Sequence, residues 1–117
     1  MPYPRRIEGE VVFPPDAANR KVARIIVELR DVSLQDRPST VIASKIMTQV
    51  VIGPNARVPF EMNAPATVPN RSLAMRVQVD TQTNSRSAAG DFLSTVNVSV
   101  PAKDDVRDLL VPVTRPG

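Results

Sequence analysis

Two aspartates at the end of a predicted strand are the residues whose type and spacing could best do chemistry in this sequence of 117 amino acids. Asp31 and Asp36 flank Ser33 in the stretch "DVSLQD". Their carboxylates could act as a pair or hold Ca²⁺, which takes six to eight oxygen ligands. The spacing lacks the dense alternation of acids found in calcium loops, and Asp and Ser side chains commonly cap backbone groups in turns. We therefore expect Asp31, Ser33 and Asp36 to organise a bulge and a turn.

A change of hydrophobic parity in the same stretch favours the bulge. Val27 and Leu29 continue an alternating strand, whereas the apolar residues after Asp31 fall on the opposite parity. One extra residue in a strand, a β-bulge, produces such a change. We expect Val27 and Leu29 to be buried, and Asp31 or Ser33 to hydrogen-bond backbone amides.

The other candidate catalytic groups are isolated. The acidic run at residues 103–105 is interpreted as a solvated turn. The sequence has no His and no Cys, which removes the commonest general base, thiol nucleophiles, the usual zinc ligands and every disulfide. A pair of Ser44 with Lys45 is chemically conceivable, but no motif positions it. We predict no enzyme activity, no cofactor and no metal site, with a hydrolase as the last-ranked alternative.

The composition argues against several classes of binding site. Fifteen Lys and Arg against twelve Asp and Glu leave a net charge of +3, and the basic residues are scattered, unlike the stripe typical of nucleic-acid binders. Binding of single strands also needs aromatic platforms, and the chain has one Tyr, three Phe and no Trp. We therefore expect no nucleic-acid partner, and no small-molecule substrate is evident. No stretch approaches the ~20 apolar residues of a membrane helix.

The elements that would position these residues are strands, because apolar residues alternate with period two between prolines. We expect strands at about residues 7–13, 22–30, 40–52, 57–62, 72–80, 92–100 and 108–113. Residues 40–52 carry apolar side chains on both parities, so their buried face is not indicated, and a helix over 41–50 is an alternative. The pattern predicts a seven- to eight-stranded antiparallel β-sandwich, immunoglobulin- or transthyretin-like, with a small β-barrel as the alternative.

We expect one domain over residues 1–117, with residues 1–5 and 114–117 as flexible tails. One predicted strand has the features of a sheet edge. It places Val58, Phe60 and Met62 on one face, and Pro59 in its middle cannot donate a ladder hydrogen bond. A partner peptide could add to such an edge as a strand, or a partner helix could lie in a groove between the sheets. Val58, Phe60 and Met62 therefore mark a candidate partner-binding edge.

Four segments of the chain, read in order, resemble a known family. They are "VELRDVSLQD", "PSTVIAS", "VPFEM" and "SLAMRVQVD". The resemblance is to the YbaY-type lipoprotein family, which includes the YscW-type pilotin-like lipoproteins of type III secretion. The family pattern is a strand ending in an L-x-D-V-S-L-x-D-like motif, a small-residue turn, an I-A-like strand, a P-F-x-L/M segment and a long alternating strand. The match covers about residues 22–113, and its most specific part is Leu29–Asp36 followed by Pro59–Met62.

The resemblance implies a small β-sandwich, an exported and membrane-anchored location in bacteria, and no catalysis. The pilotin-like branch helps an outer-membrane secretin reach its place, which implies binding or chaperoning of another envelope protein. The chain lacks the lipidated Cys and leader of the pattern, and Leu73 stands near the position of an expected aromatic. Its start, "MPYPRRIEGE", has no apolar signal region. We therefore expect a periplasmic or outer-membrane-anchored protein if a leader has been removed, and otherwise a cytoplasmic protein-binding module.

Overall fold

Eight β-strands make up the regular structure in the described part of the chain. The computed structural model describes residues 4–33, 40–65, 72–81, 92–94, 98–100 and 105–114. The strands are β1 (Pro4–Val12), β2 (Arg20–Asp31), β3 (Thr40–Ile52), β4 (Arg57–Pro65), β5 (Leu73–Asp80), β6 (Phe92–Ser94), β7 (Val98–Val100) and β8 (Val106–Thr114).

Strict alternation in the sequence produces strands with one buried and one exposed face. The clearest case is β4, in which Val58, Phe60, Met62 and Ala64 are buried and the residues between them are exposed. Apolar side chains from all the long strands thus gather on one side of the sheet, where burial of their surface stabilises the fold. The contribution of β3 is smaller, with Ile52 buried and residues such as Met47 partly buried against the core.

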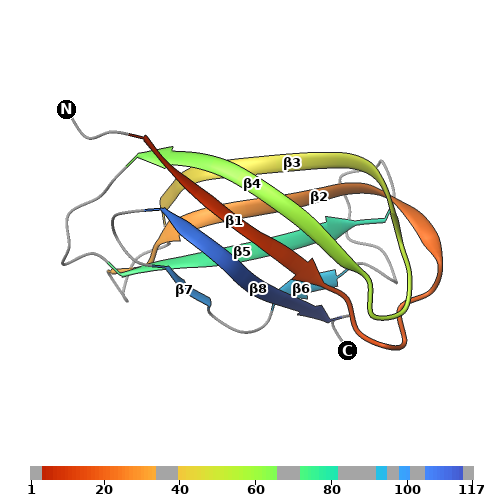
Figure 1. Ribbon diagram of the computed structural model, residues 1–117. Helices are drawn as coiled ribbons and strands as arrows, with labels where there is room; N and C mark the ends of the chain where they lie inside the picture. The colour runs from red at the N-terminus through yellow and green to blue at the C-terminus, as the bar shows by residue number, and fades with distance from the viewer. Residues whose placement is uncertain are drawn as a thin grey trace.

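The strands form one mixed sheet that curls until its two end strands approach each other. Their order is β3-β2-β5-β6-β8-β1-β4, and β7 pairs with β5. Figure 1 shows β1, β4 and β8 in front of β2, β3 and β5, and the core fills the space between them. Among the described residues no ladder joins β3 to β4. The all-β prediction is confirmed, and the arrangement is that of a nearly closed barrel.

The expectation of a purely antiparallel sandwich is wrong at one pairing. β1 and β8 run parallel, from Ile7 opposite Val106 to Val12 opposite Pro112. Parallel neighbours need a long connection, and here nearly the whole chain lies between them. Side chains alternate between the two faces of a strand whatever the direction of its neighbour. Periodicity therefore could not distinguish the two pairings.

Two predicted boundaries also change. Residues 92–100, expected as one strand, contain two short strands, β6 and β7, which pair with different parts of β5. Residues 4, 5 and 114, expected in flexible tails, belong to β1 and β8, and the side chain of Arg5 is buried. The remaining tail residues lie outside the described part of the chain.

Close packing across the core fixes the position of β4. Gly9 of β1 lies directly opposite Phe60 of β4, and a β-carbon at Gly9 would lie 2.9 Å from Cζ of Phe60. The absence of a side chain at Gly9 therefore makes room for the Phe60 ring. Elsewhere in the core, Phe13 and Phe92 pack edge to face with ring centroids 5.2 Å apart, a geometry that aromatic pairs favour.

Candidate functional site

The Asp31–Ser33 motif ends β2 and connects it to the start of β5. Oδ1 of Asp31 accepts hydrogen bonds from the backbone N–H of Ser33 at 2.9 Å and from its hydroxyl at 2.6 Å. Oγ of Ser33 accepts a bond from the N–H of Ser72 at 2.8 Å, and the N–H of Val32 donates to the carbonyl of Ser72 at 2.8 Å. Asp36 lies outside the described residues. Asp31 and Ser33 thus act as backbone caps.

A β-bulge lies beside this motif. The β2–β3 ladder shifts between Leu29 and Arg30, because β3 has one extra residue, Ile42, between the partners of these two. Val27 and Leu29 are fully buried. The extra residue therefore belongs to β3, opposite the point where the parity of the β2 sequence changes.

The polar residues considered for catalysis are not brought together. Ser44 and Lys45 point to opposite faces of β3, as successive strand residues do. Of the acidic run at 103–105, only Asp105 is described, and its Oδ1 accepts a bond from the N–H of Arg6 at 2.8 Å. Within the described ranges, no three acidic side chains are grouped as metal ligands. No helix in those ranges could span a membrane.

An acidic groove of about 640 Å³ lies on the outer face of β1, β4 and β8. Four of its nine lining residues are acidic; the lining consists of Glu8, Gly9, Glu10, Arg57, Pro59, Phe60, Glu61, Asp108 and Leu110. Exposed ion pairs neutralise part of this charge, with Arg57 Nη1 at 3.6 Å from Oε1 of Glu10. Such pairs contribute little to stability. Sequence reasoning missed the groove because three strands far apart in the sequence build it.

The two end strands of the sheet leave one side of the barrel open. Among the described residues, β3 pairs only with β2 and β4 only with β1. A short turn at residues 53–56 joins them, closed by the N–H of Ala56 donating to the carbonyl of Gly53 at 3.0 Å. Each strand therefore has one edge whose backbone groups form no ladder in the described residues, and such an edge can accept a further strand where donors and acceptors are available.

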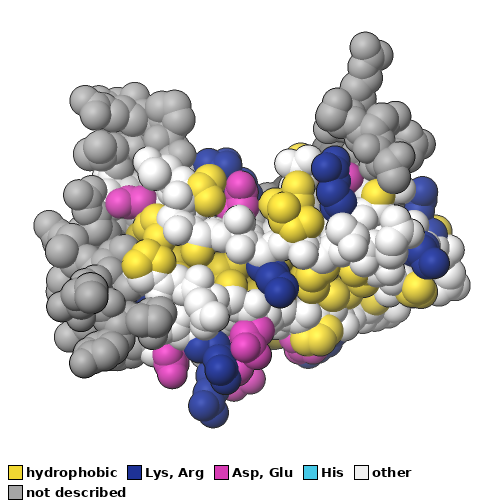
Figure 2. Space-filling view, turned by 90° about the horizontal axis from the view of Figure 1, so that it is seen from above, with side chains coloured by type: hydrophobic (Ala, Val, Ile, Leu, Met, Phe, Trp, Pro, Cys, Tyr) yellow, Lys and Arg dark blue, Asp and Glu magenta, His cyan; other side chains and the backbone are white. Residues whose placement is uncertain are grey.

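Strand β3 is the most exposed apolar element of the described structure. It is a strand throughout, which excludes the alternative helix at residues 41–50. Val41, Ile46 and Val51 are exposed by 43%, 55% and 71%, and only Ile52 of this strand is buried. Figure 2, viewed from the side of β3 and β4, shows a broken band of hydrophobic side chains interrupted by Lys and Arg. This concentration of exposed apolar side chains on one strand makes β3 the candidate interaction surface.

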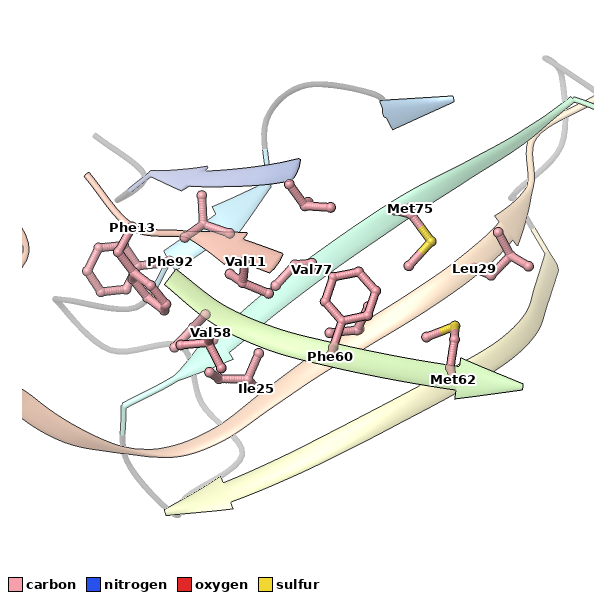
Figure 3. Close-up of a cluster of buried hydrophobic side chains, with 14 of the residues drawn as sticks. Val11, Phe13, Ile25, Leu29, Val58, Phe60, Met62, Met75, Val77 and Phe92 are labelled. Carbon is pink, nitrogen blue, oxygen red and sulfur yellow. The ribbon is translucent and has the colours of Figure 1, made fainter. Parts of the chain in front are cut away.

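The candidate edge at Val58, Phe60 and Met62 belongs to β4, the other end of the sheet. All three side chains lie in the core, with exposures of 8% or less. Figure 3 shows Phe60 and Met62 pointing from β4 toward the strands behind it. A partner at this edge would therefore contact the backbone of β4 and its exposed residues, and would not contact these three side chains.

Comparison with known proteins places the chain among secretion proteins. Residues 3–97 match the model of a family described as type III secretion system lipoprotein chaperone (YscW). No curated protein sequence matches the chain. Among solved structures, the fold is similar to an alternative pilotin from the type II secretion system of Vibrio cholerae, with a TM-score of 0.71 and 20% identity. The alignment covers 97% of this chain and 100% of that one.

Proposed function

This chain belongs to the YscW family of type III secretion system lipoprotein chaperones, and we propose that it is a non-catalytic chaperone that binds another protein of the bacterial envelope. The resemblance seen in the sequence is confirmed by the family match over residues 3–97. This match is the observation that carries the proposal.

The surface of the molecule supports a binding role. The open side of the barrel presents an unpaired strand edge in β3, together with the exposed side chains of Val41, Ile46 and Val51. A chaperone has to leave part of its apolar surface and hydrogen-bonding capacity unfilled so that a client can use them.

We propose an outer-membrane secretin as the partner. Two observations support this choice: the description of the family as a chaperone of a secretion system, and the similarity of the fold to a pilotin. The proposed location is the periplasm, with the protein held at the outer membrane by a lipid. The 117 residues contain no Cys, so the lipidated residue of such an anchor is not among them.

The test compares bacteria that carry the gene with a deletion strain and a complemented strain. We expect deletion to deplete secretin oligomers from the outer-membrane fraction while total secretin protein is still made, and complementation to restore them. The measurement is membrane fractionation followed by detection of the secretin oligomer. Unchanged oligomers in the outer membrane of the deletion strain, with secretion intact, would contradict the proposal.

A further inference from the structure

The free edges of β3 and β4 differ in hydrogen-bonding capacity. Pro59 of β4 is opposite Glu10, and Pro65 is opposite Pro4. Because proline has no N–H, it is tolerated in a ladder where its nitrogen faces away from the neighbouring strand. Pro59 and Pro65 therefore direct their nitrogens to the free edge of β4, which lacks donors at both positions. β3 contains no proline over Thr40–Ile52, so every residue along its free edge keeps its backbone N–H donor.

Apolar side chains line both faces of β3. Ile46 is opposite Ile26 on the outer face of the sheet, and Met47 is opposite Ile25 on the inner face. Ile46 is largely exposed, and Met47 is partly buried against the core. A strand laid beside β3 would extend both faces at once, since its side chains alternate. A helix uses its own backbone groups internally and could cover only one of the two faces.

Two irregularities set the length of the accepting edge. The extra residue Ile42 forms a bulge near one end of β3, and Gln49 adopts a φ of 54° near the other end. Between them, residues 43–48 pair with β2 without a shift of register. Because each irregularity redirects the local backbone groups, the regular part of the edge matches about six residues of a partner, which is an ordinary strand length.

The charge around β3 selects the chemistry of the partner. β3 contains one charged residue, the exposed Lys45, and Lys21 lies beside its far end. In the described part of the chain neither lysine is in an ion pair, whereas Arg24 Nη2 of β2 lies 2.8 Å from Oδ2 of Asp80. An acidic segment would place a carboxylate beside Lys45. A second copy of β3 would bring another Lys45 and no acid.

We propose that the free edge of β3 binds an extended segment of the partner protein in which apolar residues alternate with Asp or Glu. The segment adds to the sheet beside residues 43–48 and narrows the opening between β3 and β4. Main-chain hydrogen bonds supply affinity in this mode, and the alternating side chains supply specificity. The inference rests on the proposed function and names the surface and the partner chemistry.

The test measures backbone protection by peptides of defined sequence. The probe has about eight residues, Val alternating with Glu, and the control peptide carries Lys in place of Glu. Hydrogen–deuterium exchange of the complete chain is followed with and without about 1 mM peptide. We expect the acidic peptide to slow exchange within residues 43–48 by about threefold or more, and the basic peptide to leave it unchanged. Equal protection by both peptides, or none by the acidic one, overturns the proposal.

Two N-methylated forms of the acidic probe separate strand addition from other binding modes. One form carries N-methyl groups on the Val residues and the other on the Glu residues. Successive residues of a strand direct their backbone groups to opposite edges, so only one form keeps its donors toward β3. Because several hydrogen bonds are lost in the other form, we expect it to bind about tenfold more weakly or worse. An equal loss in both forms, as expected for a helical occupant, refutes strand addition.

A pair of protein variants checks the charge argument. We expect Lys45→Glu to weaken binding of the acidic peptide by about three- to tenfold and to strengthen binding of the basic peptide. Arg57→Glu, on the free edge of β4, is the matched control and should leave the preference unchanged. If Arg57→Glu changes the preference between the two peptides and Lys45→Glu does not, the site lies on β4 and the proposal is overturned. Protection of residues 43–48 that grows with protein concentration, without peptide, would identify a second copy as the occupant and would also overturn it.

The two proposals can fail separately. If deletion of the gene depletes secretin oligomers but residues 43–48 gain no protection, the strand-binding edge is wrong and the chaperone function stands. If the acidic peptide protects β3 but deletion leaves the secretin unchanged, the edge binds an acidic strand and the proposed function is wrong.

Discussion

Replacement of Gly9 by Ala tests how closely β1, β4 and β8 are held together. A β-carbon at this position would lie 2.6 Å from the carbonyl oxygen of Leu109, 2.8 Å from its Cβ and 2.9 Å from Cζ of Phe60. All three distances are well below the ~3.5–4.0 Å at which carbon atoms attract most strongly. The closest atom belongs to the backbone and cannot turn away by a change of rotamer, so β8 has to move. Overpacking of a core typically costs about 1–3 kcal/mol, and we expect about 2–3 kcal/mol here.

Gly53→Ala is the matched control for this substitution. There the added β-carbon meets the side-chain amide oxygen of Asn19, which is exposed and can rotate away. We expect the control to change the free energy of unfolding by less than about 0.5 kcal/mol. Urea denaturation followed by far-ultraviolet circular dichroism gives both values, and Gly9→Ala should lower the Tm by roughly 8 °C or more. If Gly9→Ala is as stable as Gly53→Ala, the close packing at Gly9 is wrong.

Three further substitutions probe other contacts by urea denaturation. Asp31→Ala removes the acceptor shared by the N–H and hydroxyl of Ser33, and should cost about 1–2 kcal/mol; a change near zero would mean that the motif does not hold the strand end. Asp80→Ala removes the carboxylate that pairs with Arg24 and should cost about 1–2 kcal/mol; a double-mutant cycle with Arg24→Ala that shows no coupling would contradict this pairing. Phe60→Ala empties the centre of the core and should cost about 3–5 kcal/mol, and thermal unfolding unchanged within error would refute its central role.

The inward faces of most strands could be predicted because burial follows alternation. Val58, Phe60 and Met62 share one parity and all lie in the core. Asp80 falls on the outward parity of β5 and is nevertheless buried. The reason is local chemistry that periodicity does not carry, because Arg24 Nη2 and the side-chain amide of Gln78 donate to its two oxygens at 2.8 Å.

The path of the sheet and the better of its two edges could not be predicted. Pro59 indicated an edge strand or a bulge, and β4 does end the sheet, but its role in partner binding stays a prediction. The edge at β3 was missed because its apolar residues fall on both parities, which indicated no buried face. The same pattern, a long strand with apolar residues on both faces and a lone Lys45, is what an open edge produces when nothing in the described chain covers it.

The parallel pairing of β1 with β8 governs when the chain can fold. The backbone N–H of Arg6 in β1 donates to the side chain of Asp105, which directly precedes β8, and the two residues are 99 positions apart in the sequence. Pairs so distant form slowly, because closing a long loop costs entropy before any contact repays it. A chain that emerges from a ribosome or a translocation pore with its N-terminus first has no β8 to pair with β1 until its last strand is released. Completion of the sheet therefore has to wait for Val106–Thr114, and a fragment that ends before Val106 lacks the ladders of β8 with β1 and β6.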